Sequence, residues 1–126
     1  MNLGILGGTF DPIHLRHLIM ANKALAYLGL DKVIFLPAGR PWMKQRQKRA
    51  SPEHRLRMVE LAVGCYQDFA VSRLEIDRRG PTYTIDSLRT LSQQVDCGTR
   101  MYFILGADSM SYFHRWKEPE EILKLC

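Results

Sequence analysis

The chain has 126 residues, of which 46% are hydrophobic and 25% are charged, a balance typical of one globular domain (residues 1–126) and not of a disordered segment. Its net charge of +5 comes from one stretch, because seven lysines and arginines but a single acid lie between Arg40 and Arg57. No apolar run reaches the ~20 residues of a membrane helix and no basic leader precedes the first apolar segment, so we expect a cytoplasmic protein without a membrane partner.

The first half of the chain alternates strand and helix patterns. Residues 2–7 are short, apolar and followed by glycine, which predicts a buried strand. Residues 33–36 are a second apolar run, and Pro37 ends it. Between them the spacing predicts a helix over residues 15–28, with Gly29 in the position of a helix-ending glycine. The side chains expected on its buried face are Leu15, Leu18, Ile19, Ala21, Leu25 and Leu28.

The second half continues the alternation. Ser51, Pro52 and Glu53 supply an N-cap, a first-turn proline and an acid, so a helix is expected to start there. Its buried residues are expected to be Leu56, Val59, Ala62 and Val63. Strands are predicted over residues 69–76 and 100–105, a helix capped by Thr82 or Thr84 lies between them, and a last helix runs from about residue 118 to the end.

This order predicts an α/β fold, an open parallel sheet with right-handed crossovers and helices on both faces. Ligands of such folds bind at the carboxyl ends of the strands. The three cysteines, Cys65, Cys97 and Cys126, are scattered, which suits a reducing compartment. We expect these thiols to pack mostly as small apolar groups, with Cys65 in the core.

The string GGTFDPIHLRH, residues 7–17, lies between the first strand and the first helix. Its glycines let the backbone approach a ligand closely, and a helix N-terminus attracts anions, so the string favours a phosphate site. His14 and His17 are three residues apart and share one helix face. Two imidazoles on that face can donate hydrogen bonds to oxygens that gain charge during phosphoryl-type transfer. A zinc-binding pair is the alternative, but only Asp11 stands nearby as a third ligand.

This string resembles GGxFDPxHxGH, the signature of HxGH nucleotidyltransferases. Later segments are similar to nicotinate-mononucleotide adenylyltransferases in particular, and the resemblance covers essentially the whole chain. These segments are residues 36–44, SPEHRLRM at 51–58, PTYTIDSL at 81–88, FILGADS at 103–109 and HRWKEPEEIL at 114–123.

The resemblance implies a Rossmann-like nucleotidyltransferase fold, incomplete at its C-terminus. It also implies a reaction in which nicotinate mononucleotide attacks the α-phosphate of ATP, giving nicotinate adenine dinucleotide and pyrophosphate, with Mg²⁺ bound to the ATP phosphates. The implied catalytic residues are His14 and His17, and no protein metal ligands are expected. The implied ATP or phosphate contacts are Gly7, Gly8, Thr9, Phe10 and Lys44, and the implied substrate contacts are Thr84, Asp108 and Trp116.

Several of these residues have simpler interpretations. Lys44 can be solvated, Trp116 can belong to the core, and Asp108 can cap the next helix, whereas His54 and His114 are expected to be structural or exposed. The basic stretch itself can be a solvated loop over residues 45–50.

Two features depart from the family pattern. Arg16 stands in place of the glycine between the two histidines, where it either fills the adenosine pocket or turns outward to meet a phosphate. Met43 stands where a histidine is common. The chain also lacks the family's SxTxxR signature, which binds ATP phosphates, so we expect a C-terminally truncated domain of marginal stability or with a tendency to form homo-oligomers.

Three functions remain open from the sequence. The first is the adenylyltransferase, for nicotinate mononucleotide or for a different phosphate substrate. The second is a truncated domain that binds a nucleotide or phosphate but catalyses nothing. The third is a basic module for RNA, which the lack of an RNA-binding signature and of aromatic residues among the basic ones disfavours, Trp42 excepted.

Overall fold

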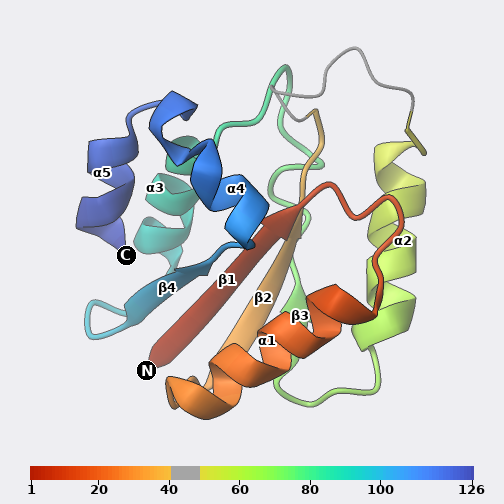
Figure 1. The fold of residues 1–126 in the computed structure, drawn as a ribbon, viewed down its shortest axis with the longest axis horizontal. Coiled ribbons are helices and arrows are strands. Elements are labelled where there is room, and N and C mark those ends of the chain that lie inside the picture. The colour runs from red at the N-terminus through yellow and green to blue at the C-terminus, as the bar shows by residue number, and fades with distance from the viewer. Residues whose placement is uncertain (41–48) are drawn as a thin grey trace.

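Four parallel strands form one sheet in the computed structural model, which describes residues 1–40 and 49–126 (Figure 1). Their order is β3-β2-β1-β4, so the chain starts in the middle of the sheet, builds out to β3 and then crosses to the other side of β1. The strands are β1 (Asn2–Gly8), β2 (Lys32–Pro37), β3 (Phe69–Val71) and β4 (Arg100–Ile104). The predicted Rossmann-like parallel sheet is confirmed, and its strand order reverses between β1 and β4.

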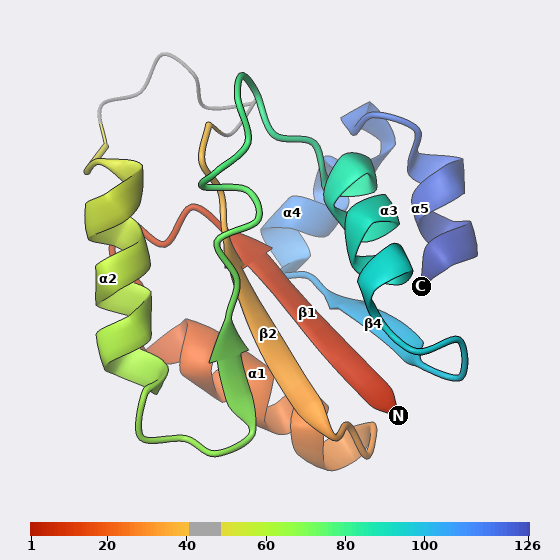
Figure 2. The same ribbon diagram turned by 180° about the vertical axis from the view of Figure 1, so that it is seen from behind.

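Helices cover both faces of the sheet (Figures 1 and 2). α1 (Leu15–Tyr27) and α2 (Pro52–Val63) pack on one face, and α3 (Thr84–Gln94) and α5 (Pro119–Leu125) pack on the other. After β4 come two short elements that the sequence did not predict, α4 (Ala107–Ser111) and the 3₁₀ turn η2 (Phe113–Arg115). Within residues 1–40 and 49–126, no helix has the length and hydropathy to cross a bilayer.

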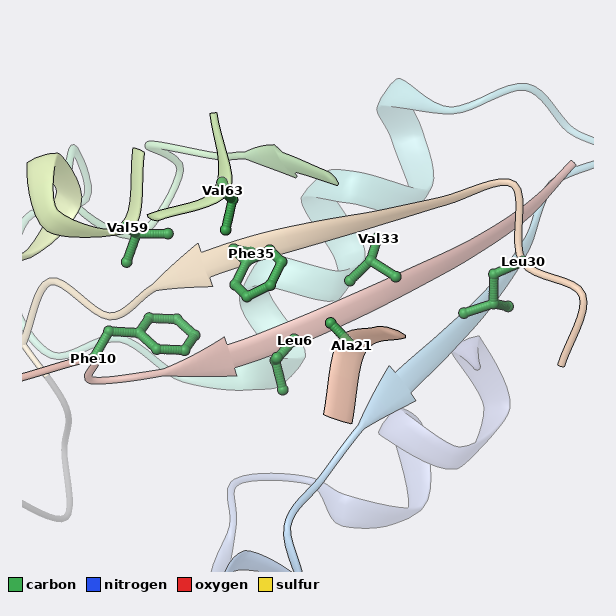
Figure 3. Close-up of a cluster of buried hydrophobic side chains, with 8 residues drawn as sticks. All are labelled: Leu6, Phe10, Ala21, Leu30, Val33, Phe35, Val59 and Val63. Carbon is green, nitrogen blue, oxygen red and sulfur yellow. The ribbon is translucent and has the colours of Figure 1, made fainter. Parts of the chain in front are cut away.

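Successive residues of the strands supply the two cores, because side chains alternate across a sheet. Leu6 of β1 faces α1 and α2, where it joins Val33 and Phe35 of β2, as Figure 3 shows. Its neighbour Ile5 faces the other way, packing with Leu88 of α3 on the opposite face. A run that is apolar on both faces is the signature of a strand buried in a parallel sheet, as the sequence predicted.

The buried face of α1 is narrower than the sequence indicated. Ala21 is fully buried against the sheet, and Leu18 and Leu25 pack beside it. Leu15 is 68% exposed, and Ile19 and Leu28 are also exposed, so these three assignments to the core are wrong. Leu15 and Ile19 lie on a different side of α1 from Ala21, which contacts the strands, and Leu28 is the C-cap residue just beyond the last turn of the helix. The buried face of α2 holds Leu56, Val59 and Val63 as predicted, with Ala62 partly buried.

The structure corrects three further expectations about where elements end and which residues are buried. β3 ends at Val71 and not at residue 76, because the chain turns where the Ser72 hydroxyl accepts from the backbone N–H of Leu74. The N-cap of α3 is Tyr83, and Thr82 instead donates to the carbonyl of Arg40 through both its N–H and its hydroxyl. The cysteines were expected to be packed, but all three are exposed, Cys65 included, because Cys65 follows the buried end of α2 at a turn.

Candidate functional site

A cleft of about 780 Å³ opens at the carboxyl ends of β1 and β4. These are the two strands between which the strand order reverses, the position where open α/β sheets bind ligands. The volume suits a nucleotide-sized ligand, since ligand pockets usually measure roughly 300–1,000 Å³. Its lining contains most of the predicted site: Gly7, Gly8, Thr9, Phe10, His14, His17 and Asp108. The sequence therefore predicted this edge of the sheet, and seven of the ten predicted site residues lie in the lining of the cleft.

The loop between β1 and α1 turns sharply at Phe10. The backbone of Phe10 has φ 52°, a left-handed conformation that a bulky residue adopts at a cost of about 1–2 kcal/mol. Its ring is buried in the core beside Phe35, so any contact that Phe10 makes with a ligand must come from its backbone. A Cβ atom at Gly8 would lie 3.3 Å from this ring. Gly8 thus makes room for Phe10, whereas the sequence suggested that it makes room for the ligand.

His14 and His17 lie side by side at the N-terminus of α1. Their rings are stacked with centroids 4.0 Å apart, and the ring of Phe10 packs edge-on against His17. The Nδ1 atom of His17 accepts a hydrogen bond from the backbone N–H of His14 at 3.1 Å. A neutral His17 must therefore carry its proton on Nε2, which leaves that atom as the donor for a ligand. This tautomer suits an imidazole that stabilises a phosphate oxygen.

Burial lowers the pKa of His17, and the neighbouring His14 lowers it further. We expect long-range ¹H–¹⁵N NMR titrations to give His17 a pKa below the ordinary histidine value of 6.5. At neutral pH the same spectra should show the tautomer that carries its proton on Nε2. The variant His14→Ala should raise this pKa without restoring it to 6.5, because burial is the larger cause. An unchanged pKa in the variant, or a protonated Nδ1 at pH 7, would contradict the proposed arrangement.

Arg55 of α2 connects the loop after β1 with both ends of the connection between β2 and α2. Its side chain is fully buried and donates four hydrogen bonds to backbone carbonyl oxygens, from the loop after β1, the end of β2 and the start of α2. The acceptors are Thr9 at 2.9 Å, Ala38, Gly39 at 3.0 Å and Ala50 at 3.0 Å. Arg55 belongs to the basic stretch between Arg40 and Arg57, but its side chain is buried inside the protein and is not part of an exposed basic surface. Its position four residues before the buried Val59 was the available signal.

Among the described residues, four charged side chains line the cleft besides the histidines: Arg16, Arg49, Asp11 and Asp108. Asp11 is bound within the protein, since its Oδ2 accepts from the N–H of Ala50 at 3.0 Å. Arg16, which replaces the family glycine, lies in the lining itself, where a ligand would meet it. Arg49 was not among the predicted site residues. Lys44, the predicted phosphate contact, falls outside the described residues.

The predicted substrate residues do not all meet at this cleft. Asp108 lines it from the first turn of α4, but Thr84 and Trp116 are absent from its lining. Thr84 is the first residue of α3, and Trp116 packs edge-on against Phe103 with ring centroids 5.9 Å apart. Both remain predictions as substrate contacts.

A buried carboxyl group connects the segment after β3 to α3, the helix that begins at Thr84. Glu75 is 7% exposed, and its Oε2 accepts from the hydroxyl of Ser87 at 2.6 Å, while Arg78 donates to the same hydroxyl. Burial raises the pKa of Glu75 to about 7, against the hydrogen bond from Ser87 and the charge of Arg78, which lower it. The backbone of Glu75 also lies so close to Gly39 that a Cβ there would collide with its carbonyl oxygen.

The raised pKa of Glu75 predicts a pH dependence of stability. Folding favours the protonated carboxyl, so this contribution is complete below about pH 4.5 and is lost as the pH rises through about 7. The free energy of unfolding should fall over that window by up to roughly 3 kcal/mol more in the wild type than in Glu75→Gln, which cannot ionise. Urea unfolding from pH 4.5 to 8 measures the difference, and parallel curves for the two proteins would rule the assignment out.

The described residues contain no cluster of three or more histidine, cysteine or acidic side chains that could hold a metal ion. The only carboxylates in the described lining of the cleft are Asp11 and Asp108, and Asp11 is already hydrogen-bonded to Ala50. A divalent cation here would therefore depend mainly on oxygens that a ligand supplies.

Comparison with known proteins agrees with this geometry. The profile of the cytidylyltransferase-like family matches residues 5–126. The chain is 47% identical over 122 residues to a probable nicotinate-nucleotide adenylyltransferase of Arthrobacter sp. (strain FB24), covering 96% of this chain and 58% of that protein. The probable nicotinate-nucleotide adenylyltransferase of Dehalococcoides mccartyi (strain CBDB1) is 46% identical over 126 residues, covering 100% of this chain and 62% of that protein. The chain thus spans about three fifths of the length of these relatives.

Solved structures share the fold at lower identity. Plasmodium falciparum nicotinic acid mononucleotide adenylyltransferase complexed with NaAD superposes with a TM-score of 0.79 at 20% identity, over 96% of this chain and 59% of that chain. A putative nicotinate-nucleotide adenylyltransferase from Vibrio parahaemolyticus gives a TM-score of 0.74 at 19% identity, over 98% and 72%. At these identities the comparison establishes the architecture of the sheet and its helices.

Proposed function

The chain belongs to the cytidylyltransferase-like family, and we propose that it contributes the catalytic core for transfer of AMP from ATP to nicotinate mononucleotide. The products would be nicotinate adenine dinucleotide and pyrophosphate. The proposal is supported by the identity of 44–47% to relatives that carry the name nicotinate-nucleotide adenylyltransferase. The observation that carries it is the stacked pair His14 and His17 at the cleft between β1 and β4.

The reaction needs a phosphate oxygen of the mononucleotide to form a bond to the α-phosphorus of ATP while the bond from that phosphorus to pyrophosphate breaks. No side chain has to become covalently attached, because positioning and charge stabilisation account for most of this chemistry. The Nε2–H of His17 would donate to an oxygen of the transferring phosphoryl group. The backbone of Gly8 and Thr9 and the first turn of α1 would hold the phosphates of ATP.

The second substrate would lie toward Asp108, with Thr84 and Trp116 shaping its pyridine and ribose pocket. Mg²⁺ would be carried by the ATP phosphates, where it neutralises their charge. Lys44 would add a further phosphate contact. We place this activity in the cytoplasm, where the three free and exposed thiols stay reduced, and propose neither a nucleic-acid partner nor a membrane partner. We also propose that copies of the chain associate through the exposed Leu15 and Ile19.

The direct test is pyrophosphate release by the purified chain with ATP, Mg²⁺ and nicotinate mononucleotide. Release that depends on the mononucleotide supports the proposal, and omission of each substrate is the control. Arg16→Gly should be assayed in parallel, because Arg16 occupies the cleft lining where the family pattern has glycine. If neither protein releases pyrophosphate, the second candidate is favoured, a domain that binds phosphate without catalysis. If pyrophosphate is released only with another phosphate monoester, that compound and not nicotinate mononucleotide is the acceptor.

A further inference from the structure

We propose that Arg49 is a phosphate-binding residue of the cleft and that it binds through its buried Nη2 atom. This inference rests on the proposed function only in naming the phosphate as that of a nucleotide. Arg49 lies in the connection between β2 and α2, shortly before α2 begins at Pro52, and it lines the same cleft as Thr9 and His14.

The first observation is an unsatisfied donor. Among the described residues, the Nη2 atom of Arg49 is the only side-chain nitrogen or oxygen that is buried without a hydrogen-bond partner. Leaving a charged group in this state costs more than the roughly 1–3 kcal/mol of a neutral one. Native structures rarely keep such a group unless a ligand, an ion or water completes it. The donor therefore points to a partner that enters the cleft.

The second observation is an excess of positive charge. Burial is the largest cause that lowers the pKa of Arg55, and the positive charge of the neighbouring Arg49 is the second. Asp11 acts in the opposite direction and raises the pKa of Arg55. The Asp11 carboxylate already accepts from Ala50, and the four acceptors of Arg55 are neutral carbonyls that carry no compensating charge. An anion beside Arg49 would relieve this repulsion.

The third observation concerns the kind of anion. Arg49 lines the cleft from the segment before α2, whereas His14 and His17 line it from the start of α1. A tetrahedral phosphate offers several oxygens to donors that converge from different directions, and a guanidinium matches that geometry with paired N–H groups. A phosphate group can thus satisfy Arg49 and the histidine pair together.

The test is calorimetric titration of the chain with tripolyphosphate at fixed ionic strength, because this probe carries phosphates but no nucleoside. We expect Arg49→Gln to weaken binding by at least about tenfold, the loss typical of a charged hydrogen bond, and Arg49→Lys to restore part of it. The matched control is Arg57→Gln, because Arg57 belongs to the same basic stretch but its side chain is 68% exposed and lies 3.9 Å from Glu60. Equal affinity of wild type and Arg49→Gln would overturn the inference, as would an equal loss in Arg57→Gln or no binding by the wild type.

Thermal unfolding separates a ligand-binding role from a structural one. Without ligand, Arg49→Gln should unfold at the same temperature as the wild type or higher, because it removes the repulsion on Arg55. With tripolyphosphate, the wild type should gain more stability than the variant, since binding to the folded state stabilises it. A lower unfolding temperature of Arg49→Gln without ligand would show that Arg49 is structural and would reject the inference.

The pyrophosphate-release assay keeps this inference distinct from the proposed function. Binding that depends on Arg49 without any transfer would support the inference and reject the activity. Transfer of AMP by a chain whose affinity for tripolyphosphate is unchanged in Arg49→Gln would support the activity and reject the inference.

Discussion

Replacement of His17 by alanine should lower the rate of AMP transfer by about 10²–10³-fold, the usual effect of removing one donor aimed at the charge that develops in a transition state. The reason is geometric. The Nδ1 atom of His17 is held by the backbone N–H of His14, so the Nε2 proton is fixed toward the cleft before the substrate arrives.

The measurement is the initial rate of pyrophosphate release at saturating ATP and nicotinate mononucleotide. The fold should survive, because His17 is only partly buried and its contact with the Phe10 ring lies at the edge of the core. Circular dichroism and the unfolding midpoint check this. His54→Ala is the control, since His54 is exposed on α2 and its side chain lies outside the cleft lining. A folded His17→Ala protein with the wild-type rate would remove His17 from the mechanism.

Replacement of Arg55 by leucine should lower the free energy of unfolding by about 3–5 kcal/mol, among the largest effects expected of a single substitution. Leucine fills much of the space but leaves four carbonyl oxygens without their donor, and the hydrogen bonds lost at Ala38 and Gly39 are buried. Thr9 lines the cleft, and Ala50 directly follows Arg49, which also lines it. The variant should therefore lose ligand affinity as well as stability, because the carbonyls of Thr9 and Ala50 are no longer held at fixed positions.

Urea unfolding at pH 7 tests this prediction. Arg57→Leu is the matched control, two residues along the same helix and exposed to solvent, and it should change the free energy of unfolding by less than about 0.5 kcal/mol. Arg55→Lys should fall between the two, since a lysine has one ammonium group where arginine offers a planar set of donors. Equal midpoints for Arg55→Leu and Arg57→Leu would mean that water replaces the lost donors and that Arg55 does not hold the loops.

These expectations place the histidines and Arg55 in different roles. His14 and His17 face the cleft and would act on the ligand, so their replacement should change turnover more than stability. Arg55 lies behind the cleft with its whole side chain buried, so its replacement should change stability first. Arg49 resembles each of them in one respect: it lines the cleft as the histidines do, and its positive charge acts on Arg55.

Local pattern determined the fold class and the place of the site. The apolar runs at residues 2–7 and 33–36 predicted strands buried on both sides, and the helical spacing between the strands predicted crossovers. The string at residues 7–17 follows the first strand directly. Its place at the carboxyl end of β1 was therefore settled by chain connectivity alone, and the cleft that it lines follows from the strand order.

Only the tertiary structure decided what each charged or apolar side chain contacts. Arg55 and Arg57 stand two residues apart in one basic stretch, yet one is fully buried and the other is exposed, because α2 turns them to opposite sides. Leu15 and Ala21 belong to one apolar pattern, yet only Ala21 meets the sheet. Periodicity specifies which residues share a face, but the angle at which a helix docks is set by packing over the whole sheet. The carbonyl oxygens that hold Arg55 come from three separate segments, and no local stretch of the sequence contains them all.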